Sequence, residues 1–155
     1  MIRGVITSDW EFFFELGREY YEKEAPSMFL GLGYDKESIF RHFIQLTTSK
    51  IATVFVYDDG IAKGLIAVGI VPWYANEGVK VANIVHWWVP TKHRGEGVGK
   101  ALLEAAAGWS REKGAVVLIA TEPEAGGPPS EWYESQEFYS LERKRVKLLG
   151  DENGN

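Results

Sequence analysis

A glycine-rich segment at residues 94–99 has the composition and the surroundings of a phosphate-binding turn. It reads RGEGVG, follows an apolar run at residues 81–89 and precedes an amphipathic stretch at residues 100–113. A glycine turn between a strand and a helix gathers unpaired backbone N–H groups at the positive end of the helix dipole. Because such a turn accepts phosphate oxygens, the sequence predicts that a phosphorylated cofactor binds here.

The glycine spacing excludes two common nucleotide-binding loops. A Walker loop needs glycine where Arg94 stands and a serine or threonine hydroxyl where Ala101 stands. A G-x-G-x-x-G fingerprint starting at Gly95 or Gly97 lacks its third glycine, and it should open a series of βαβ units. Glycine also occurs in strand-to-helix turns only because it can adopt positive φ. The evidence that this turn binds phosphate must therefore come from the flanking segments.

Length and composition fit one globular domain. The chain has 155 residues, of which 45% are hydrophobic, and a net charge of −5. This is enough for one core and too short for two, so we expect a single domain over residues 1–149 and a flexible tail over residues 150–155. The basic cluster at residues 143–147 is interpreted as the solvated face of a late strand, and no nucleic-acid partner is expected.

Cysteine is absent from the chain, and no long apolar run is free of charged residues. The first observation excludes disulfides, thiolate metal sites and a cysteine nucleophile, and no metal site is expected. If the protein moves an acyl group, direct attack is therefore the default route. The second observation, with an N-terminus that lacks a signal-type apolar region, predicts a cytoplasmic protein without a membrane span.

Apolar periodicity predicts an ordered series of strands and helices. Strands are expected at residues 2–6, 52–57, 61–71, 81–89 and 115–121, with a final strand pair at residues 138–149. Helices are expected from a Ser8 capping box to Ala25-Pro26, from an Asp35 cap through Thr47, and over residues 100–113 and 130–136. Strand, helix and strand around the glycine turn imply a right-handed parallel crossover.

The element order and three segments resemble the GNAT superfamily of N-acetyltransferases across nearly the whole chain. The segments are the Arg-x-x-Gly-x-Gly turn, Val89 five residues before it, and a Trp-Tyr-Glu run at residues 132–134 followed by Phe138. Glu137 stands where the family has glycine, so the turn into the last strands is expected to differ. The Trp-Trp-Val run also looks like small acetyltransferase-like proteins of bacteriophages. The resemblance implies an α/β (α+β) fold, with a mostly antiparallel central sheet, a parallel splayed fourth and fifth strand, and about four flanking helices.

The resemblance further implies an N-acetyltransferase that moves an acetyl group from acetyl-CoA to a primary amine by direct attack in a ternary complex. The residues expected to bind coenzyme A are Trp87, Trp88 and Val89 along the pantetheine arm, and Arg94, Gly95, Glu96, Gly97, Val98, Gly99 and Lys100 at the pyrophosphate. Tyr133 falls on the family tyrosine that faces the sulfur, where a phenol can protonate the leaving thiolate. A plain core position is the alternative for this residue.

The general base is the weakest part of the resemblance. The positions where the family places its base fall on Asn83 and Val85, and neither side chain can accept the amine proton. His86 is the nearest ionisable group on that strand, but strict alternation turns it to the opposite face unless a β-bulge re-aims it. A buried hydrogen-bonded histidine is the alternative role. Weaker candidates for the base are Glu77 and Glu122.

Two further expectations concern the acceptor and the class of protein. The helix pair and its loop shape the acceptor pocket in the family, which makes Met28, Phe29, Tyr34 and His42 candidates for its wall; a core position for Phe29 and a surface position for His42 are the alternatives. The expected partners are a small-molecule or peptide amine and a second copy of the chain. Because the family base is missing, a non-catalytic acyl-CoA-binding or protein-interaction module on the same fold is the alternative function. Neither the identity of the amine nor the acyl chain length follows from the sequence.

Overall fold

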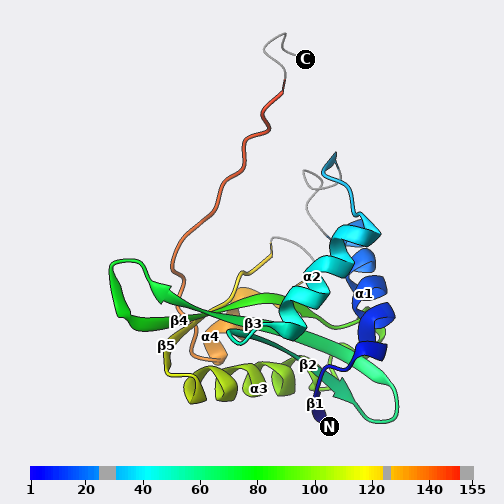
Figure 1. The fold of residues 1–155 in the computed structure, drawn as a ribbon, viewed down its shortest axis with the longest axis horizontal. Coiled ribbons are helices and arrows are strands. Elements are labelled where there is room, and N and C mark those ends of the chain that lie inside the picture. Colours follow the sequence, from blue (N-terminus) through cyan, green and yellow to red (C-terminus); the bar gives the residue numbers. More distant parts are fainter. Residues whose placement is uncertain (25–30, 124–126, 151–155) are drawn as a thin grey trace.

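The computed structural model describes residues 1–24, 31–123 and 127–150. Figure 1 shows α1 and α2 over one face of a twisted sheet and α3 over the other. The elements in chain order are β1 (Ile2–Gly4), the 3-10 turn η1 (Thr7–Asp9), α1 (Trp10–Lys23), α2 (Lys36–Thr48), β2 (Ala52–Asp58), β3 (Ala62–Trp73), β4 (Asn76–Trp88), the 3-10 turn η3 (Thr91–His93), α3 (Val98–Glu112), β5 (Ala115–Ile119) and α4 (Ser130–Ser135).

The sheet has the order β1-β2-β3-β4-β5, antiparallel except for the parallel β4–β5 pair. β3 lies at its centre, and residues 65–68 are almost fully buried because helices cover both faces. Leu65 and Ala67 pack towards α1 and α2, whereas Ile66 and Val68 pack towards α3. The predicted mixed class is confirmed, as is the parallel crossover.

β4 and β5 are paired over only part of their length. Their last register pair joins Asn83 to Ile119, and β4 then continues to Trp88 without β5 beside it. The two strands therefore separate beyond Asn83, which is the splay that the resemblance implied. Along this stretch the backbone of β4 keeps hydrogen-bonding groups that no β5 residue uses.

Three helix starts differ in how well the sequence predicted them. Asp35 caps α2 as expected, with its carboxylate accepting from the N–H of Ser38 at 2.8 Å. The Ser8 capping box is wrong, since residues 7–9 form a 3-10 turn and the carboxylate of Asp9 accepts from the N–H of Ile6. α3 begins at Val98, two residues earlier than predicted, because the helix starts within the glycine turn. The predicted Ala25-Pro26 end of the first helix lies outside the described residues.

The β3–β4 hairpin is longer than predicted. β4 begins at Asn76 rather than Val81, and Trp73 pairs with Asn76 where a polar loop was expected. Backbone hydrogen bonds extend the ladder here without a buried face, because this end of the hairpin projects beyond the helices and even Trp73 and Tyr74 are exposed. The pattern of apolar residues indicates only which strand positions are buried, so it does not predict this solvent-exposed extension.

The prediction of a final strand pair at residues 138–149 is wrong. Residues 139–150 are extended, exposed and without a strand partner among the described residues, and they run away from the sheet in Figure 1. The chain leaves α4 through Glu137, which has φ 64°. A glutamate thus holds the left-handed conformation for which the family has glycine, and it sets the direction of the segment that follows.

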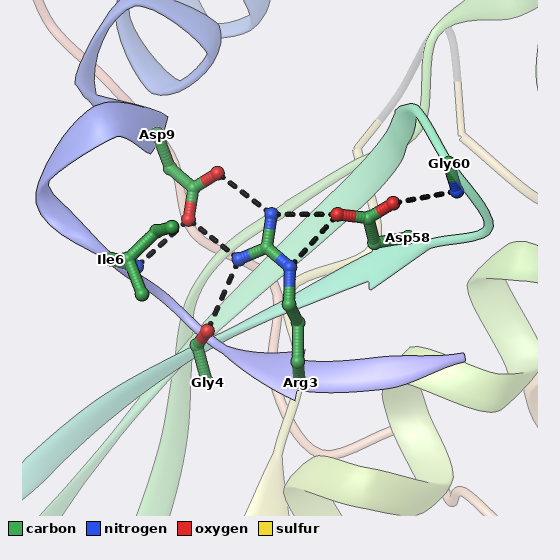
Figure 2. A network of polar contacts seen from close by, with 6 residues as sticks. All are labelled: Arg3, Gly4, Ile6, Asp9, Asp58 and Gly60. Atoms are coloured by element: carbon green, nitrogen blue, oxygen red, sulfur yellow. Dashed lines mark hydrogen bonds and ion pairs between the residues drawn. The ribbon is translucent and has the colours of Figure 1, made fainter.

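A partly buried ion-pair network ties the N-terminal strand to two other elements (Figure 2). The Arg3 guanidinium donates to both carboxylate oxygens of Asp9, at 2.8 and 2.9 Å, and its Nε donates to Asp58 at 2.9 Å. Asp9 is only 6% exposed, and it also accepts from the N–H of Ile6. β1, the entry to α1 and the end of β2 are therefore joined through one side chain.

We expect Asp9→Asn to destabilise the protein by about 2–3 kcal/mol at pH 7, because it leaves the Arg3 charge without its buried partner. Burial alone would raise the pKa of Asp9, but the hydrogen bonds from Arg3 and Ile6 outweigh it and hold that pKa below its usual value. The stabilisation is therefore present above about pH 4 and is lost as the pH falls through the lowered pKa. Thermal melts at pH 7 and pH 3 should show a wide difference between wild type and variant that narrows in acid.

The control for this prediction is Asp59→Asn, which removes an exposed carboxylate from the neighbouring hairpin turn. It should melt close to wild type at both pH values. Equal melting of Asp9→Asn and wild type at pH 7 would contradict the stabilising role of the network.

Candidate active site

β4 carries a β-bulge next to the point where it leaves β5. His86 pairs with Ala67 and Ile84 pairs with Val68, so Val85 is an extra residue without a partner on β3. A bulge of this kind changes which residues share a face of the strand.

The bulge brings His86 to the face that Asn83 occupies. Asn83 pairs with Gly69 and His86 with Ala67, two positions of β3 that face α1 and α2. Strict alternation would have placed them on opposite faces. The bulge therefore turns His86 to the face of Asn83, which the sequence analysis required of a candidate base.

His86 lies in a ring of aromatic side chains and touches a second histidine. Its Nε2 is 2.7 Å from Nε2 of His42 on α2, and its ring contacts Phe13 and Trp88. Burial, with a smaller contribution from His42, lowers the pKa of His86 to about 3, and burial also lowers the pKa of His42. Both rings are neutral at pH 7, so one Nε2 donates and the other accepts. The alternative surface position for His42 is wrong.

Tyr133 lies on the opposite face of β4, in a cluster that joins α4 to the strand. Its ring contacts those of Trp87, Trp132 and Phe138, with centroids 5.4–6.2 Å apart across the cluster. The side chain is 7% exposed, and burial, followed by the charges of Glu122 and Tyr20, raises its pKa to about 12. The phenol therefore keeps its proton at any physiological pH.

The two indoles beside the site have different surroundings. Trp88 packs against α1, where a Cβ added to Gly17 would lie 2.8 Å from its ring, and it stacks on Tyr20. Trp87 faces α3, and its Nε1 is buried without a hydrogen-bond partner in the part of the chain that the structure describes. That donor lies close to Gly99 in the first turn of α3.

The glycine turn presents free backbone donors. Gly95 and Gly97 have φ of 83° and 82°, which side-chain-bearing residues rarely adopt. Gly97 caps α3, and no side chain accepts from the first N–H groups of that helix among the described residues. A Cβ at either glycine would meet nothing within 4 Å, so the requirement for glycine here is conformational.

Two ion pairs hold the turn from opposite sides. Arg94 donates through Nε to the carbonyl of Val89 at 3.0 Å and through Nη2 to Glu24 at the end of α1. Glu96 accepts from Lys63 at 3.3 Å, on the β2–β3 hairpin. The turn is thereby fastened to the helix on one side and to the hairpin on the other.

The structure thus divides the predicted site residues into three groups. The turn from Arg94 to Lys100 and the end of β4 adjoin one another; His86 projects from the face of β4 that meets α1 and α2, and Tyr133 packs against the opposite face. Lys100 forms a long ion pair with Glu104, at 3.9 Å. Of the acceptor-wall candidates, Tyr34 donates its hydroxyl to the carbonyl of Phe14 and Met28 and Phe29 lie outside the described residues.

Sequence reasoning missed three residues that the structure places at the site. These are Glu24, Tyr20 and Lys63. Glu24 precedes Arg94 by 70 positions, and no sequence motif links the two residues. Helical spacing could have placed Tyr20 on the buried face of α1 together with Phe13, but nothing in the sequence pairs Lys63 with Glu96.

The splayed β4–β5 pair and the glycine turn at the start of α3 define an acyltransferase fold, and comparisons with known proteins agree. A family model described as "Acetyltransferase (GNAT) family" matches residues 10–139. A Trypanosoma brucei acetyltransferase superimposes with TM-score 0.72 at 24% identity, covering 96% of this chain and 99% of its own. Glucosamine-6-phosphate N-acetyltransferase from Arabidopsis thaliana gives TM-score 0.71 at 18% identity, covering 97% and 98%.

A third similar structure is AAC(6')-Iy in complex with the bisubstrate analogue CoA-S-monomethyl-acetylneamine. It superimposes with TM-score 0.67 at 19% identity and covers 97% of both chains. A search of curated proteins returns no match for this chain.

The chain belongs to the GNAT acetyltransferase family. Members of this family use acetyl-CoA as co-substrate and acetylate an amine, so the protein is an acyl-CoA-dependent acetyltransferase. No helix within residues 1–24, 31–123 and 127–150 has the length and apolar character needed to cross a bilayer.

We expect His86 to stay unprotonated from pH 8 down to pH 5, because burial opposes its charged form. A denatured chain would titrate its histidines near pH 6.5, so the folded state also loses stability as the pH falls below that value. The measurement is an NMR titration of the imidazole resonances, assigned with His42→Gln and His86→Gln. A His86 midpoint near 6.5 would contradict the buried neutral pair.

Proposed function

We propose that the protein acetylates the primary amine of a small molecule or peptide by direct attack on acetyl-CoA within a ternary complex. The observation that carries the proposal is the uncapped start of α3, with two left-handed glycines, beside the stretch of β4 that β5 leaves unpaired. An anion site and an open strand edge thus lie next to each other, and coenzyme A has a pyrophosphate followed by an amide-bearing arm.

The turn suits the pyrophosphate for electrostatic reasons. Backbone N–H groups from Glu96 to Lys100 and the side chain of Arg94 are its donors, and each hydrogen bond to a charged oxygen contributes about 1.5–3 kcal/mol. Four or five such bonds would supply much of the affinity. Arg94 is held by Glu24, so its pairing with phosphate competes with an existing ion pair.

The edge of β4 suits the pantetheine arm. From Trp87 to Val89 the strand end is free of β5, and backbone groups there can pair with the two amides of the arm as a neighbouring strand would. The buried Nε1 of Trp87 is a further donor near the first turn of α3. The thioester that acetyl-CoA supplies would then lie near the splay of the sheet.

Tyr133 is proposed as the acid for the leaving thiolate. Its phenol is protonated at neutral pH, since burial raises the pKa to about 12, and α4 packs it against Trp87 at the end of β4. Donation of this proton neutralises the negative charge that develops on sulfur as the carbon–sulfur bond breaks.

His86 is proposed as the group that takes the amine proton. A lysine-like amine costs about 4–5 kcal/mol to deprotonate at pH 7. With a pKa of about 3, His86 does not hold a proton, but its contact with His42 allows it to pass one on. A proton accepted at Nδ1 is matched by transfer of the Nε2 proton to His42, which releases its own Nδ1 proton to solvent, and neither ring keeps a charge.

Gly97→Glu should abolish acetyl-CoA binding. The side chain would force the left-handed residue into a strained conformation and place a carboxylate where phosphate binds. Isothermal calorimetry with acetyl-CoA measures the loss. Gly108→Glu is the control, since Gly108 lies within α3, has open space around it and should bind as wild type does. No binding by wild type at hundreds of micromolar would refute the cofactor site.

Tyr133→Phe should lower kcat by about 10²-fold while the KM for acetyl-CoA stays near its wild-type value, because the ring packing remains and only the proton donor is lost. Thiol release with a panel of amines measures the rate. Tyr139→Phe, at a tyrosine that is 92% exposed, is the matched control and should leave the rate unchanged. If wild type binds acetyl-CoA but releases no thiol with any amine, the chain is a binding module and the proposal fails.

A further inference from the structure

One carboxylate beside the glycine turn depends on Arg94 for its charge balance. Glu24 directly follows α1 as its C-cap residue, and its side chain is only 14% exposed. A negative charge at the C-terminal end of a helix is unfavourable, because the last carbonyl groups already make that end negative. The guanidinium of Arg94 offsets this, since its Nη2 donates to Oε1 of Glu24.

The nearest cation in the sequence does not share this role. Lys23 is 68% exposed and forms an ion pair with Glu19 instead. Within the part of the chain that the structure describes, Arg94 is the one ion-pair partner of Glu24. Whatever takes the guanidinium of Arg94 away therefore leaves a largely buried carboxylate unpaired, and such a group needs another cation.

The pyrophosphate of acetyl-CoA is a strong competitor for Arg94. Each of its phosphates carries a negative charge, and it binds among the N–H groups of the turn, so it attracts the guanidinium more strongly than one carboxylate does. Nε of Arg94 donates to the carbonyl of Val89 at 3.0 Å, which keeps the guanidinium beside the turn while its Nη groups change partner. Binding of acetyl-CoA thus frees Glu24.

A row of partly exposed aromatic side chains leads from Glu24 to the proposed base. The N–H of Glu24 donates to the carbonyl of Tyr20, so the two residues lie one turn apart on the same face of α1. The ring of Tyr20 stacks on Trp88 with centroids 6.2 Å apart, and Trp88 contacts His86 with centroids 4.4 Å apart. None of these three rings is fully buried.

Electrostatics places the same carboxylate near the proposed acid. Burial, followed by the charge of Glu24, raises the pKa of Tyr20. Tyr20 in turn adds to the raised pKa of Tyr133, after burial and Glu122. The end of α1 therefore lies within electrostatic reach of Tyr133 and is connected through Tyr20 and Trp88 to His86.

We infer that Glu24 selects an acceptor with a second positive charge, and that acetyl-CoA makes this carboxylate available by drawing Arg94 to its pyrophosphate. The acceptor class is an amine that bears another cationic group across an apolar spacer, as a linear diamine does. The reacting amine lies at His86, the spacer lies against the rings of Tyr20 and Trp88, and the second ammonium pairs with Glu24. The inference rests on the proposed function, and it places acetyl-CoA binding before acceptor binding.

The first test is calorimetry with coenzyme A, which has no acetyl group to transfer, and linear diamines from diaminobutane to diaminooctane. At least one diamine should bind about tenfold more tightly to the coenzyme A complex than to the free protein, because only the complex has an unpaired Glu24. By linkage, that diamine should tighten coenzyme A by the same factor. The monoamine of matched length, which lacks the second charge, should show no coupling.

Glu24→Gln should remove this coupling and tighten coenzyme A alone by about threefold, since Arg94 no longer has to leave an ion pair. Circular dichroism melts show whether the variant keeps the wild-type fold. Glu22→Gln is the matched control, because it removes a carboxylate that is 54% exposed from the same helix. It should keep both the coupling and the wild-type affinity for coenzyme A.

The second test is the rate of thiol release from acetyl-CoA with the same diamines and monoamines. Wild type should favour the coupled diamine over its matched monoamine through a lower KM, with similar kcat for both. Glu24→Gln should erase this preference by raising KM for the diamine alone. A merely structural role for Glu24 would instead change the kinetics of both amines together.

The outcomes separate this inference from the proposed function. If coenzyme A does not bind wild type at hundreds of micromolar, the proposed function fails and the inference fails with it. If coenzyme A binds but no diamine of the series is coupled to it, only the inference is overturned. Equal coupling in wild type and Glu24→Gln, or its loss in Glu22→Gln as well, would also overturn it, because the second charge would then not bind at Glu24.

Discussion

The antiparallel pairing of β3 with β4, interrupted by one extra residue at Val85, is the constraint on which the candidate site depends. β3 is buried on both faces, so a shift of its register would exchange side chains between the two cores and disrupt the packing of both. β4 takes its register from this strand. The bulge then decides which β4 side chains meet α1 and α2 and which meet α3 and α4, and it does so at the point where β5 departs.

Because of this arrangement, the two proposed proton-transfer groups belong to separate packing environments. His86 is enclosed with His42 on one face, whereas Tyr133 is enclosed with Trp87 on the other. Burial acts on the pKa of each in the direction that keeps it neutral, lowering that of the histidine and raising that of the tyrosine. A neutral His86 can accept the proton that the amine loses, and a neutral Tyr133 can donate a proton to the leaving thiolate.

Ion pairs between distant parts of the chain fasten the glycine turn to its neighbours. Arg94 is joined to α1 through Glu24, and Glu96 is joined to the β2–β3 hairpin through Lys63. The Arg3 network similarly connects β1, the entry to α1 and the end of β2. These contacts hold loops in place that have few apolar side chains of their own, and a preorganised turn loses less entropy when it binds an anion.

The sequence by itself determined the features that depend on local pattern. Glycine spacing defined the turn, the Asp35 cap and the apolar runs located most elements, and the order of those elements was enough for the mixed sheet and its parallel crossover. Three features were decided only by the tertiary structure: the bulge at Val85, the pairing of His86 with His42, and the course of the chain beyond Glu137. Each depends on contacts between residues far apart in the chain or on a register set by a neighbouring strand, and periodicity within one segment carries no information about either.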